Sequence, residues 1–217
     1  MKKLAIFDLD GTLFDTTLAM QLCGNYALEK LGLPTFPAKA YAGFSGGGIE
    51  GYVFAILDAA GDVEHKHFHK FWELYCEKNL EVGTAPNVPF DGIVPMLEKL
   101  KEMGVILAVL SNKDHESCVR IVEEIFGEGM FDVIRGNGED LPPKPHPAGM
   151  EAVLRETGFS REEALYVGDT EVDMETGKNA GVFTIAVLWG YRSEEVLAAY
   201  SPEAIITSPE DILKLIP

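Results

Sequence analysis

Cysteine is scarce in this chain of 217 residues, and its three copies lie far apart. Cys23, Cys76 and Cys118 form no C-x-x-C pair and are odd in number, which argues against a disulfide framework and against a zinc cluster. Long hydrophobic runs are also missing, because no apolar stretch approaches the roughly 18 residues that a membrane-spanning helix needs. No secretory signal is evident before the first strand pattern, so we expect a cytoplasmic protein that binds no membrane.

Positive charge is in short supply as well. The chain has 18 Lys and Arg residues against 35 Asp and Glu residues, for a formal net charge of −17. Nucleic-acid binders need a basic surface that displaces counterions from phosphates, so this balance argues against a nucleic-acid partner. A small phosphorylated molecule remains possible as a partner, provided that its pocket supplies positive charge locally.

Strand and helix patterns alternate over most of the chain, which is typical of an α/β fold with a parallel sheet and helices on both faces. Residues 16–85 are the exception, because they show helical patterns only. We therefore expect a core domain of residues 1–15 and 86–217 with an inserted all-helical domain of residues 16–85. The strands are expected at 4–7, 105–110, 133–134, 164–167, 183–188 and, as an edge strand, 204–207. The helices are expected at 18–31, 37–43, 49–60, 64–80, 93–103, 115–126, 148–157 and 174–180.

Two carboxylates leave the first predicted strand together. Asp8 and Asp10 follow the apolar run of residues 4–7, and residues two apart on a strand point the same way. Gly11 and Thr12 then open a turn whose backbone N–H groups lie beside two like charges, an arrangement that suits a bound ion. The alternative is that both acids only cap the following helix.

Further polar residues follow other predicted strands, where open α/β sheets bind ligands. Ser111 and Asn112 could hold an anionic oxygen, or they form a turn with a helix cap. Lys144 lies between prolines, which orient one cation, although a stiff linker with a solvated lysine is the alternative. Asp169 and Asp173 offer hard oxygen ligands for Mg²⁺, or they act as helix caps.

Together these stretches resemble the signature motifs of the haloacid dehalogenase-like phosphohydrolases. The motifs are the pentad of residues 8–12, the serine at 111, the lysine at 144 and the acids at 169 and 173; residues 187–191 resemble the phosphoglycolate phosphatase branch. The resemblance implies a Rossmann-like core with a helical cap domain, and it implies Mg²⁺ as the cofactor. The metal ligands it implies are Asp8, the Asp10 carbonyl, Asp169 and Asp173.

The same resemblance assigns catalytic roles. Asp8 is the expected nucleophile, Asp10 the expected proton carrier, and Ser111 and Lys144 are expected to hold the phosphoryl oxygens. Gly11 and Asn112 are expected to assist in binding the substrate. The implied reaction is Mg²⁺-dependent hydrolysis of a small phosphomonoester through an aspartyl-phosphate.

The cap carries one candidate specificity loop, residues 43–48, in which Phe44 and Ser45 are expected to touch the leaving group; a glycine hinge between helices is the alternative. The loop contains no Arg or Lys, which argues against a bound carboxylate and hence against phosphoglycolate itself. His65 and His69 would share a helix face, but neighbouring lysines oppose a cation, so a solvated polar face is expected there.

Other activities stay open at this point. A sugar-phosphate mutase similar to β-phosphoglucomutase would pass the phosphoryl group to a second hydroxyl, and a phosphonatase would use a lysine of the cap. A non-catalytic, metal-dependent binding module is the alternative from another class. For the assembly, we expect a monomer or a small homo-oligomer.

Overall fold

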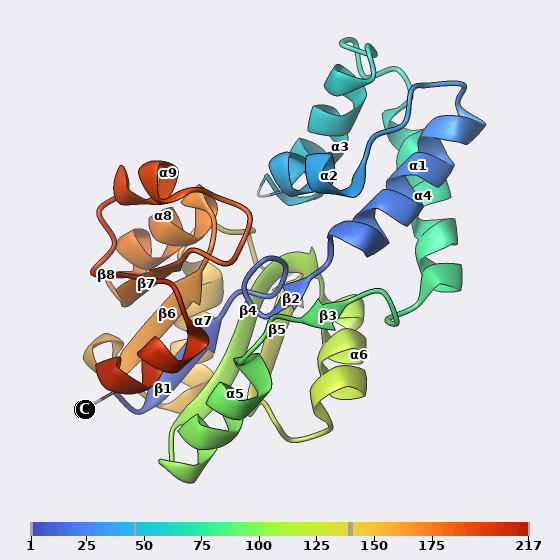
Figure 1. Ribbon diagram of the computed structural model, residues 1–217. Helices are drawn as coiled ribbons and strands as arrows, with labels where there is room; N and C mark the ends of the chain where they lie inside the picture. The colour runs from blue at the N-terminus through green and yellow to red at the C-terminus, as the bar shows by residue number, and fades with distance from the viewer. Residues whose placement is uncertain (1, 46, 139–140, 217) are drawn as a thin grey trace. The chain divides into compact units, whose positions relative to one another are not determined.

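The computed structural model describes residues 2–45, 47–138 and 141–216 (Figure 1). The chain divides into two compact units: one comprises Met1–Phe14 and Pro89–Pro217, and the other comprises Asp15–Val88. The sequence-based boundaries, at residues 15/16 and 85/86, lie close to these. At the boundary, β2 (Phe14–Asp15) and β3 (Val88–Pro89) form a two-stranded sheet.

The first unit is built on a six-stranded sheet with the order β5-β4-β1-β6-β7-β8. All five neighbouring pairs run parallel. This confirms the α/β class with a parallel sheet. The strands are β1 (Leu4–Phe7), β4 (Ile106–Asp114), β5 (Val133–Asn137), β6 (Ala164–Gly168), β7 (Phe183–Val187) and β8 (Ala204–Ile206).

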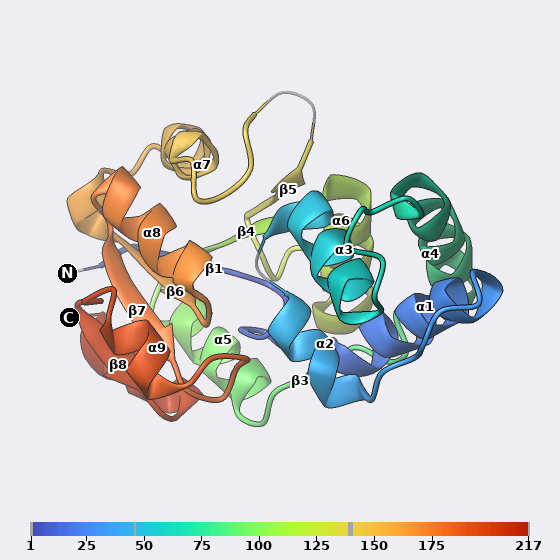
Figure 2. The ribbon, with the colours of Figure 1, turned by 90° about the horizontal axis from the view of Figure 1, so that it is seen from above.

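Alternate residues of the central strand β1 supply two separate cores. Ala5 and Phe7 pack with apolar side chains of α5 (Ile93–Glu102) and α6 (His115–Phe126). Leu4 and Ile6 face the other way and pack with α7 (Ala148–Thr157). Figure 2 shows α5 and α7 on opposite sides of β1. Because both faces are covered, all four residues of β1 are fully buried, as a continuous apolar strand predicts.

The remaining elements of this unit are short helices around the sheet. They are α8 (Glu171–Ala180), α9 (Glu194–Ala198) and the 3-10 helices η1 (Arg161–Glu163) and η2 (Pro209–Leu215). Met174 of α8 and Leu197 of α9 pack with Ala186 of β7. Helix α8 begins three residues before the predicted start because Thr170 and Asp173 form a capping box at its N-terminus.

Strand β4 is longer than the sequence predicts, and this matters for the site. It was expected to end at Leu110, with a turn from Ser111, but it continues to Asp114. The reason is its partner: after a register shift, Asp114 of β4 pairs with Asn137 of β5. Asp114 then caps α6 by accepting a hydrogen bond from the backbone N–H of Ser117 at 2.9 Å.

The second unit has its own core of helices. These are α1 (Thr17–Lys30), α2 (Ala38–Phe44), α3 (Gly48–Ala59) and α4 (Phe68–Val82), and their apolar faces form one cluster that includes Tyr41, Ile56 and Phe71. None of the described residues between 16 and 85 forms a strand. No helix in the described ranges is both long and apolar enough to cross a membrane.

The predicted start of the last helix in this unit is wrong. A helix was expected from Glu64, but α4 starts at Phe68. Asp62 stabilises a turn before α4 by accepting hydrogen bonds from the backbone N–H groups of Lys66 and His67 and from the His67 ring. His65, with a φ of 51°, pairs instead with Asp58 at 2.8 Å, so His65 and His69 do not share a helix face.

Candidate active site

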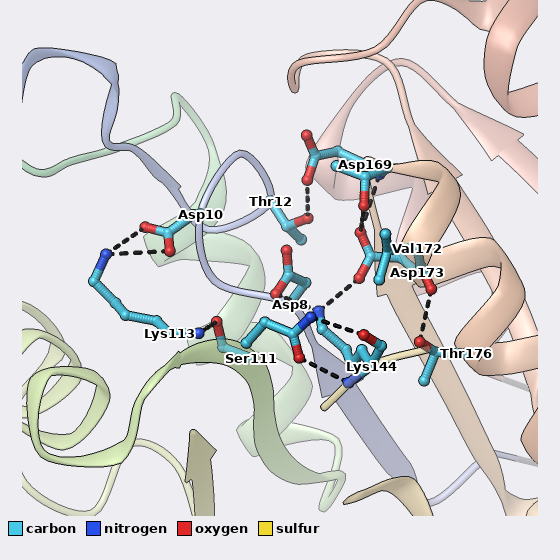
Figure 3. A network of polar contacts seen from close by, with 12 residues as sticks. Asp8, Asp10, Thr12, Ser111, Lys113, Lys144, Asp169, Val172, Asp173 and Thr176 are labelled. Atoms are coloured by element: carbon cyan, nitrogen blue, oxygen red, sulfur yellow. Dashed lines mark hydrogen bonds and ion pairs between the residues drawn. The ribbon is translucent and has the colours of Figure 1, made fainter. Parts of the chain in front are cut away.

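The predicted polar residues of the first unit gather at the carboxyl ends of its central strands. Asp8 and Asp10 follow β1, Ser111 lies near the end of β4, and Asp169 follows β6. Lys144 comes from the segment between β5 and α7. Figure 3 shows Asp8, Lys144 and Asp173 directed toward one another, with Asp169 nearby, whereas Asp10 is directed toward Lys113. They meet there because parallel strands end at a common edge, so residues far apart in sequence become neighbours.

Lys144 is the centre of the buried charges. Its Nζ lies 2.7 Å from Asp8 Oδ1 and 2.7 Å from Asp173 Oδ1, and it donates to the Tyr166 hydroxyl at 3.1 Å. The lysine side chain is 5% exposed and that of Asp173 is not exposed at all. Buried ion pairs depend on further hydrogen bonds to their polar atoms, and the Tyr166 hydroxyl supplies one to Lys144 and one to Asp173.

Asp173 has both carboxylate oxygens occupied. Oδ1 accepts from Lys144 and from the Tyr166 hydroxyl at 2.7 Å, and Oδ2 accepts from the Thr170 hydroxyl at 2.6 Å and the Thr170 N–H at 3.0 Å. The geometry therefore suits Asp173 to positioning Lys144 more than to binding a ligand directly.

Asp169 is fully buried, and the hydrogen bonds that it accepts from described residues come from neutral donors. Its Oδ1 accepts from the Thr12 hydroxyl at 3.0 Å and its Oδ2 from the Tyr191 backbone N–H at 2.8 Å. The turn after β1 presses against it: Gly11 has a φ of 91°, and a Cβ there would lie 2.3 Å from Asp169 Oδ2. A Cβ on Gly190 would lie 2.3 Å from Asp169 Cβ. Both close approaches require glycine.

The buried carboxylates fit a divalent metal ion. Oxygen atoms of Asp8, Asp169 and Asp173 lie within 4.8 Å of one another, and all three residues are buried. Three carboxylates against the single ammonium group of Lys144 leave two negative charges, which a divalent cation would balance. Carboxylate oxygens are hard donors that suit Mg²⁺ or Mn²⁺.

Burial and crowding change the acidity of these groups in the protein without metal. Burial, with the Asp173 charge added, raises the pKa of Asp8 to about 7, although Lys144 opposes this. Burial and the Asp173 and Asp8 charges also raise the pKa of Asp169 well above its usual range. Burial opposes ionisation of Asp173 too, but the Lys144 charge and hydrogen bond outweigh it and lower the pKa.

Ser111 and Asn112 are adjacent in sequence but make different hydrogen bonds. The Ser111 Oγ accepts from the backbone N–H of Lys113 at 3.2 Å. The Asn112 side chain reaches the Lys144 backbone, donating to its carbonyl at 2.9 Å and accepting from its N–H at 2.7 Å. Asn112 thus anchors Lys144 across 32 residues of sequence. Its predicted contact with a substrate stays a prediction.

Asp10 has a partner that the sequence analysis missed. Lys113 Nζ lies 3.1 Å from Asp10 Oδ1 and 3.2 Å from its Oδ2, with both side chains mostly buried. Residues two apart on a strand share a face, so a strand that continues past Leu110 would place Ser111 and Lys113 on the same face. Lys113 was overlooked because the strand was expected to end at Leu110.

Tyr166 and Thr12 were also missed as partners of the site. Tyr166 lies within β6 and reads as a core residue, yet its hydroxyl bonds to Asp173 and Lys144. Thr12 was expected only as part of the turn, but it also bonds to Asp169 and accepts from the Trp189 indole at its carbonyl oxygen at 2.9 Å. Nothing in a single sequence pairs these residues, since most of the contacts join separate segments of the chain.

The two predicted cap residues belong to the helical unit. Phe44 ends α2, and its ring lies 5.5 Å from those of Phe36 and Tyr41 in edge contacts. Ser45 is the C-cap of α2 in an extended conformation. Gly46 of the predicted loop lies outside the described residues. The contact of Phe44 and Ser45 with a leaving group stays a prediction.

Comparisons with known proteins agree with this arrangement. The profile of the haloacid dehalogenase-like hydrolase family matches residues 5–187. The chain is 33% identical to the phosphoglycolate phosphatase of Aquifex aeolicus, over 98% of this chain and 96% of that protein. It is 26% identical to the pyrophosphatase PpaX of Listeria monocytogenes, over 97% of this chain and 94% of that protein. A crystal structure described as a predicted phosphoglycolate phosphatase, from Haemophilus somnus, is 28% identical with a TM-score of 0.90, covering 100% of this chain and 98% of that one.

Proposed function

This chain belongs to the haloacid dehalogenase-like hydrolases, and we propose that it is a Mg²⁺-dependent phosphatase that hydrolyses small phosphomonoesters through an aspartyl-phosphate on Asp8. The observation that carries the proposal is the buried group of Asp8, Asp169 and Asp173, of which Asp8 and Asp173 pair with Lys144. The phosphatase names of the relatives support the reaction class.

In the first step an Asp8 carboxylate oxygen attacks phosphorus, and the bond from phosphorus to the ester oxygen breaks. Asp10 gives its proton to the departing oxygen. In the second step Asp10 takes a proton from water, the water oxygen attacks phosphorus, and the bond from Asp8 to phosphorus breaks to release inorganic phosphate. One difficult hydrolysis thereby becomes two easier displacements.

Positive charge is essential because an anionic carboxylate attacks an anionic phosphate. Lys144, held 2.7 Å from Asp8 by Asp173 and Asn112, supports this role. The Ser111 hydroxyl is neutral and would donate a hydrogen bond to a phosphoryl oxygen. Asp8, Asp169 and the Asp10 carbonyl would hold the Mg²⁺ ion, with Asp173 acting through Lys144. When bound, the ion supplies electrostatic stabilisation of the phosphoryl oxygens.

The helical unit is proposed as a cap that covers the site and contributes to specificity through Phe44 and Ser45. Its own apolar core supports movement as one body on the two linkers. A cytoplasmic location and a monomer or small homo-oligomer remain predictions.

The first experiment measures inorganic phosphate released from p-nitrophenyl phosphate and phosphoglycolate, with Mg²⁺ or with EDTA. The Asp8→Asn variant removes the nucleophile but keeps the shape of the side chain, so we expect turnover to fall at least ~10³-fold without loss of folding. Asp91→Asn, at an exposed acid of the same unit, is the matched control and should keep full activity.

Retained turnover in Asp8→Asn would remove the nucleophile assignment. A folded, metal-loaded protein that releases no phosphate from any ester would contradict the phosphatase proposal. Isomer formation from β-glucose-1-phosphate would then favour a mutase.

A further inference from the structure

The ion pair between Lys113 and Asp10 is not explained by the proposed chemistry. In that chemistry Asp10 delivers a proton to the ester oxygen, yet both of its oxygens face an ammonium group at 3.1 and 3.2 Å. An acid held in this way points at Lys113 and not at a leaving group. A productive complex must therefore give Lys113 another partner or lose the contact.

The geometry of the ion pair between Lys113 and Asp10 suits the exchange of Asp10 for another anion. Its contacts are longer than the 2.7 Å contacts of Lys144, and its side chains are 20% and 14% exposed, against 5% and 9% for Lys144 and Asp8. Lys144 is committed to two carboxylates and a hydroxyl. Among the described residues, Lys113 and Lys144 contribute ammonium groups that contact carboxylates of this site, and the Lys113 side chain is the more exposed of the two.

The position of Lys113 defines what it would bind. It contacts the residue that serves the leaving-group oxygen, so it lies on the leaving-group side of the scissile bond. A group attached one or two atoms beyond that oxygen falls within reach of the flexible four-carbon lysine side chain. Because the partner that it would exchange is a carboxylate, a second carboxylate is the chemically matched replacement.

On the basis of the proposed function, we infer that Lys113 is a specificity-determining residue that binds a carboxylate on the alcohol part of the phosphomonoester and, in doing so, releases Asp10 to the ester oxygen. The substrate class is that of small phosphorylated hydroxy acids. The cation that the predicted cap loop lacks then comes from strand β4 of the core unit.

The test compares two esters that differ only in this group: phosphoglycolate, and 2-hydroxyethyl phosphate, in which a neutral alcohol replaces the carboxylate. Wild-type enzyme with Mg²⁺ should prefer phosphoglycolate by at least about 10-fold in kcat/KM. Lys113→Met should lower kcat/KM for phosphoglycolate by about 10- to 100-fold, mainly through KM, the range typical of losing one contact to a charged group. The same variant should lower kcat/KM for 2-hydroxyethyl phosphate by a clearly smaller factor, so that the ratio of the two kcat/KM values falls.

Two variants complete the design. Lys113→Arg keeps the charge and should retain part of the preference for phosphoglycolate. Lys101→Met removes a lysine of the same unit that bonds to the carbonyls of Gly129 and Met130, so it controls for the change in net charge and should not alter the preference. If Lys113→Met does not fold, Lys113→Gln and the wild-type preference still decide the question.

Equal losses for both esters in the Lys113 variants, or a wild-type enzyme that does not prefer the carboxylate ester, would overturn the inference while leaving the phosphatase intact. No hydrolysis of either ester or of p-nitrophenyl phosphate by folded wild-type enzyme would overturn the proposed function itself.

Discussion

At the scale of single residues, the site depends on positions where a side chain is forbidden. Gly11 combines a left-handed backbone with direct contact between its Cα and the Asp169 carboxylate. Any other residue there meets two separate penalties, backbone strain and a clash with a proposed metal ligand. A glycine that has a positive φ but open space around it can separate backbone strain from the clash.

Gly11→Ala should lower Mg²⁺ affinity at least ~10-fold, because the new Cβ would lie 2.3 Å from Asp169 Oδ2 and must displace it. Gly104→Ala is the control, since Gly104 also has a positive φ, 77°, but nothing lies within 4 Å of a Cβ there. Both variants should lose about 1–2 kcal/mol of unfolding free energy to backbone strain. The Mg²⁺ dependence of activity, measured for both, decides; equal Mg²⁺ affinity in the two variants would contradict the role of Asp169.

At the scale of elements, helix α8 begins inside the site. Its capping residue Thr170 and its first-turn acid Asp173 bond to each other, and the same Asp173 holds Lys144 and Tyr166. Asp173 therefore links the start of this helix to Lys144, the proposed catalytic lysine. The described residues contain another capping box, Ser160 with Glu163, at η1; there Glu163 pairs with the exposed Lys3, which is not one of the proposed site residues.

Thr170→Ala removes the 2.6 Å bond to Asp173 and should lower the unfolding free energy by about 1 kcal/mol, as loss of an N-cap side chain does. It should also lower kcat several-fold, because Asp173 then holds Lys144 less firmly. Ser160→Ala should have a stability effect of similar size and no effect on kcat. Denaturant unfolding and steady-state kinetics on both variants test this, and unchanged kcat in Thr170→Ala would break the proposed link.

At the scale of the whole molecule, the uncompensated acids couple stability to pH and metal. The raised pKa values of Asp8 and Asp169 mean that, without metal, the folded protein keeps protons that the unfolded chain has released above about pH 4. The folded state then binds more protons than the unfolded state. The contribution of Asp8 and Asp169 to the free energy of unfolding therefore falls as pH rises from about 4 toward 7.

Mg²⁺ competes with these protons, so its stabilising effect should grow with pH. At a concentration about 100 times its Kd, we expect Mg²⁺ to raise Tm by about 5–10 °C at pH 8. At pH 5.5 the rise should be less than half as large. Thermal unfolding with Mg²⁺ or EDTA measures both values, with Asp169→Asn as the control that should lose the effect. An equal rise in Tm at the two pH values would argue against metal binding by these carboxylates.

The order of strands and helices was predictable because it follows from local patterns. The apolar run of β1, the alternation after residue 86 and the helical spacing of residues 16–85 are each visible within about 15 residues of sequence. The carboxylates at 8, 10, 169 and 173 were predictable for the same reason, since each follows a strand pattern. Element ends were less predictable: β4 extends to Asp114 through pairing with β5, and α4 starts late because of Asp62.

The sequence by itself determined the class of fold and the kinds of chemical group at the sheet edge, because periodicity and strand ends are local properties. Only the tertiary structure decided which groups touch. Lys113 meets Asp10 across 103 residues, Asn112 meets Lys144 across 32, and Lys144 joins Asp8 across 136. Such contacts arise because parallel strands bring distant loops to one edge, where burial makes each unpaired charge costly and so selects its partner.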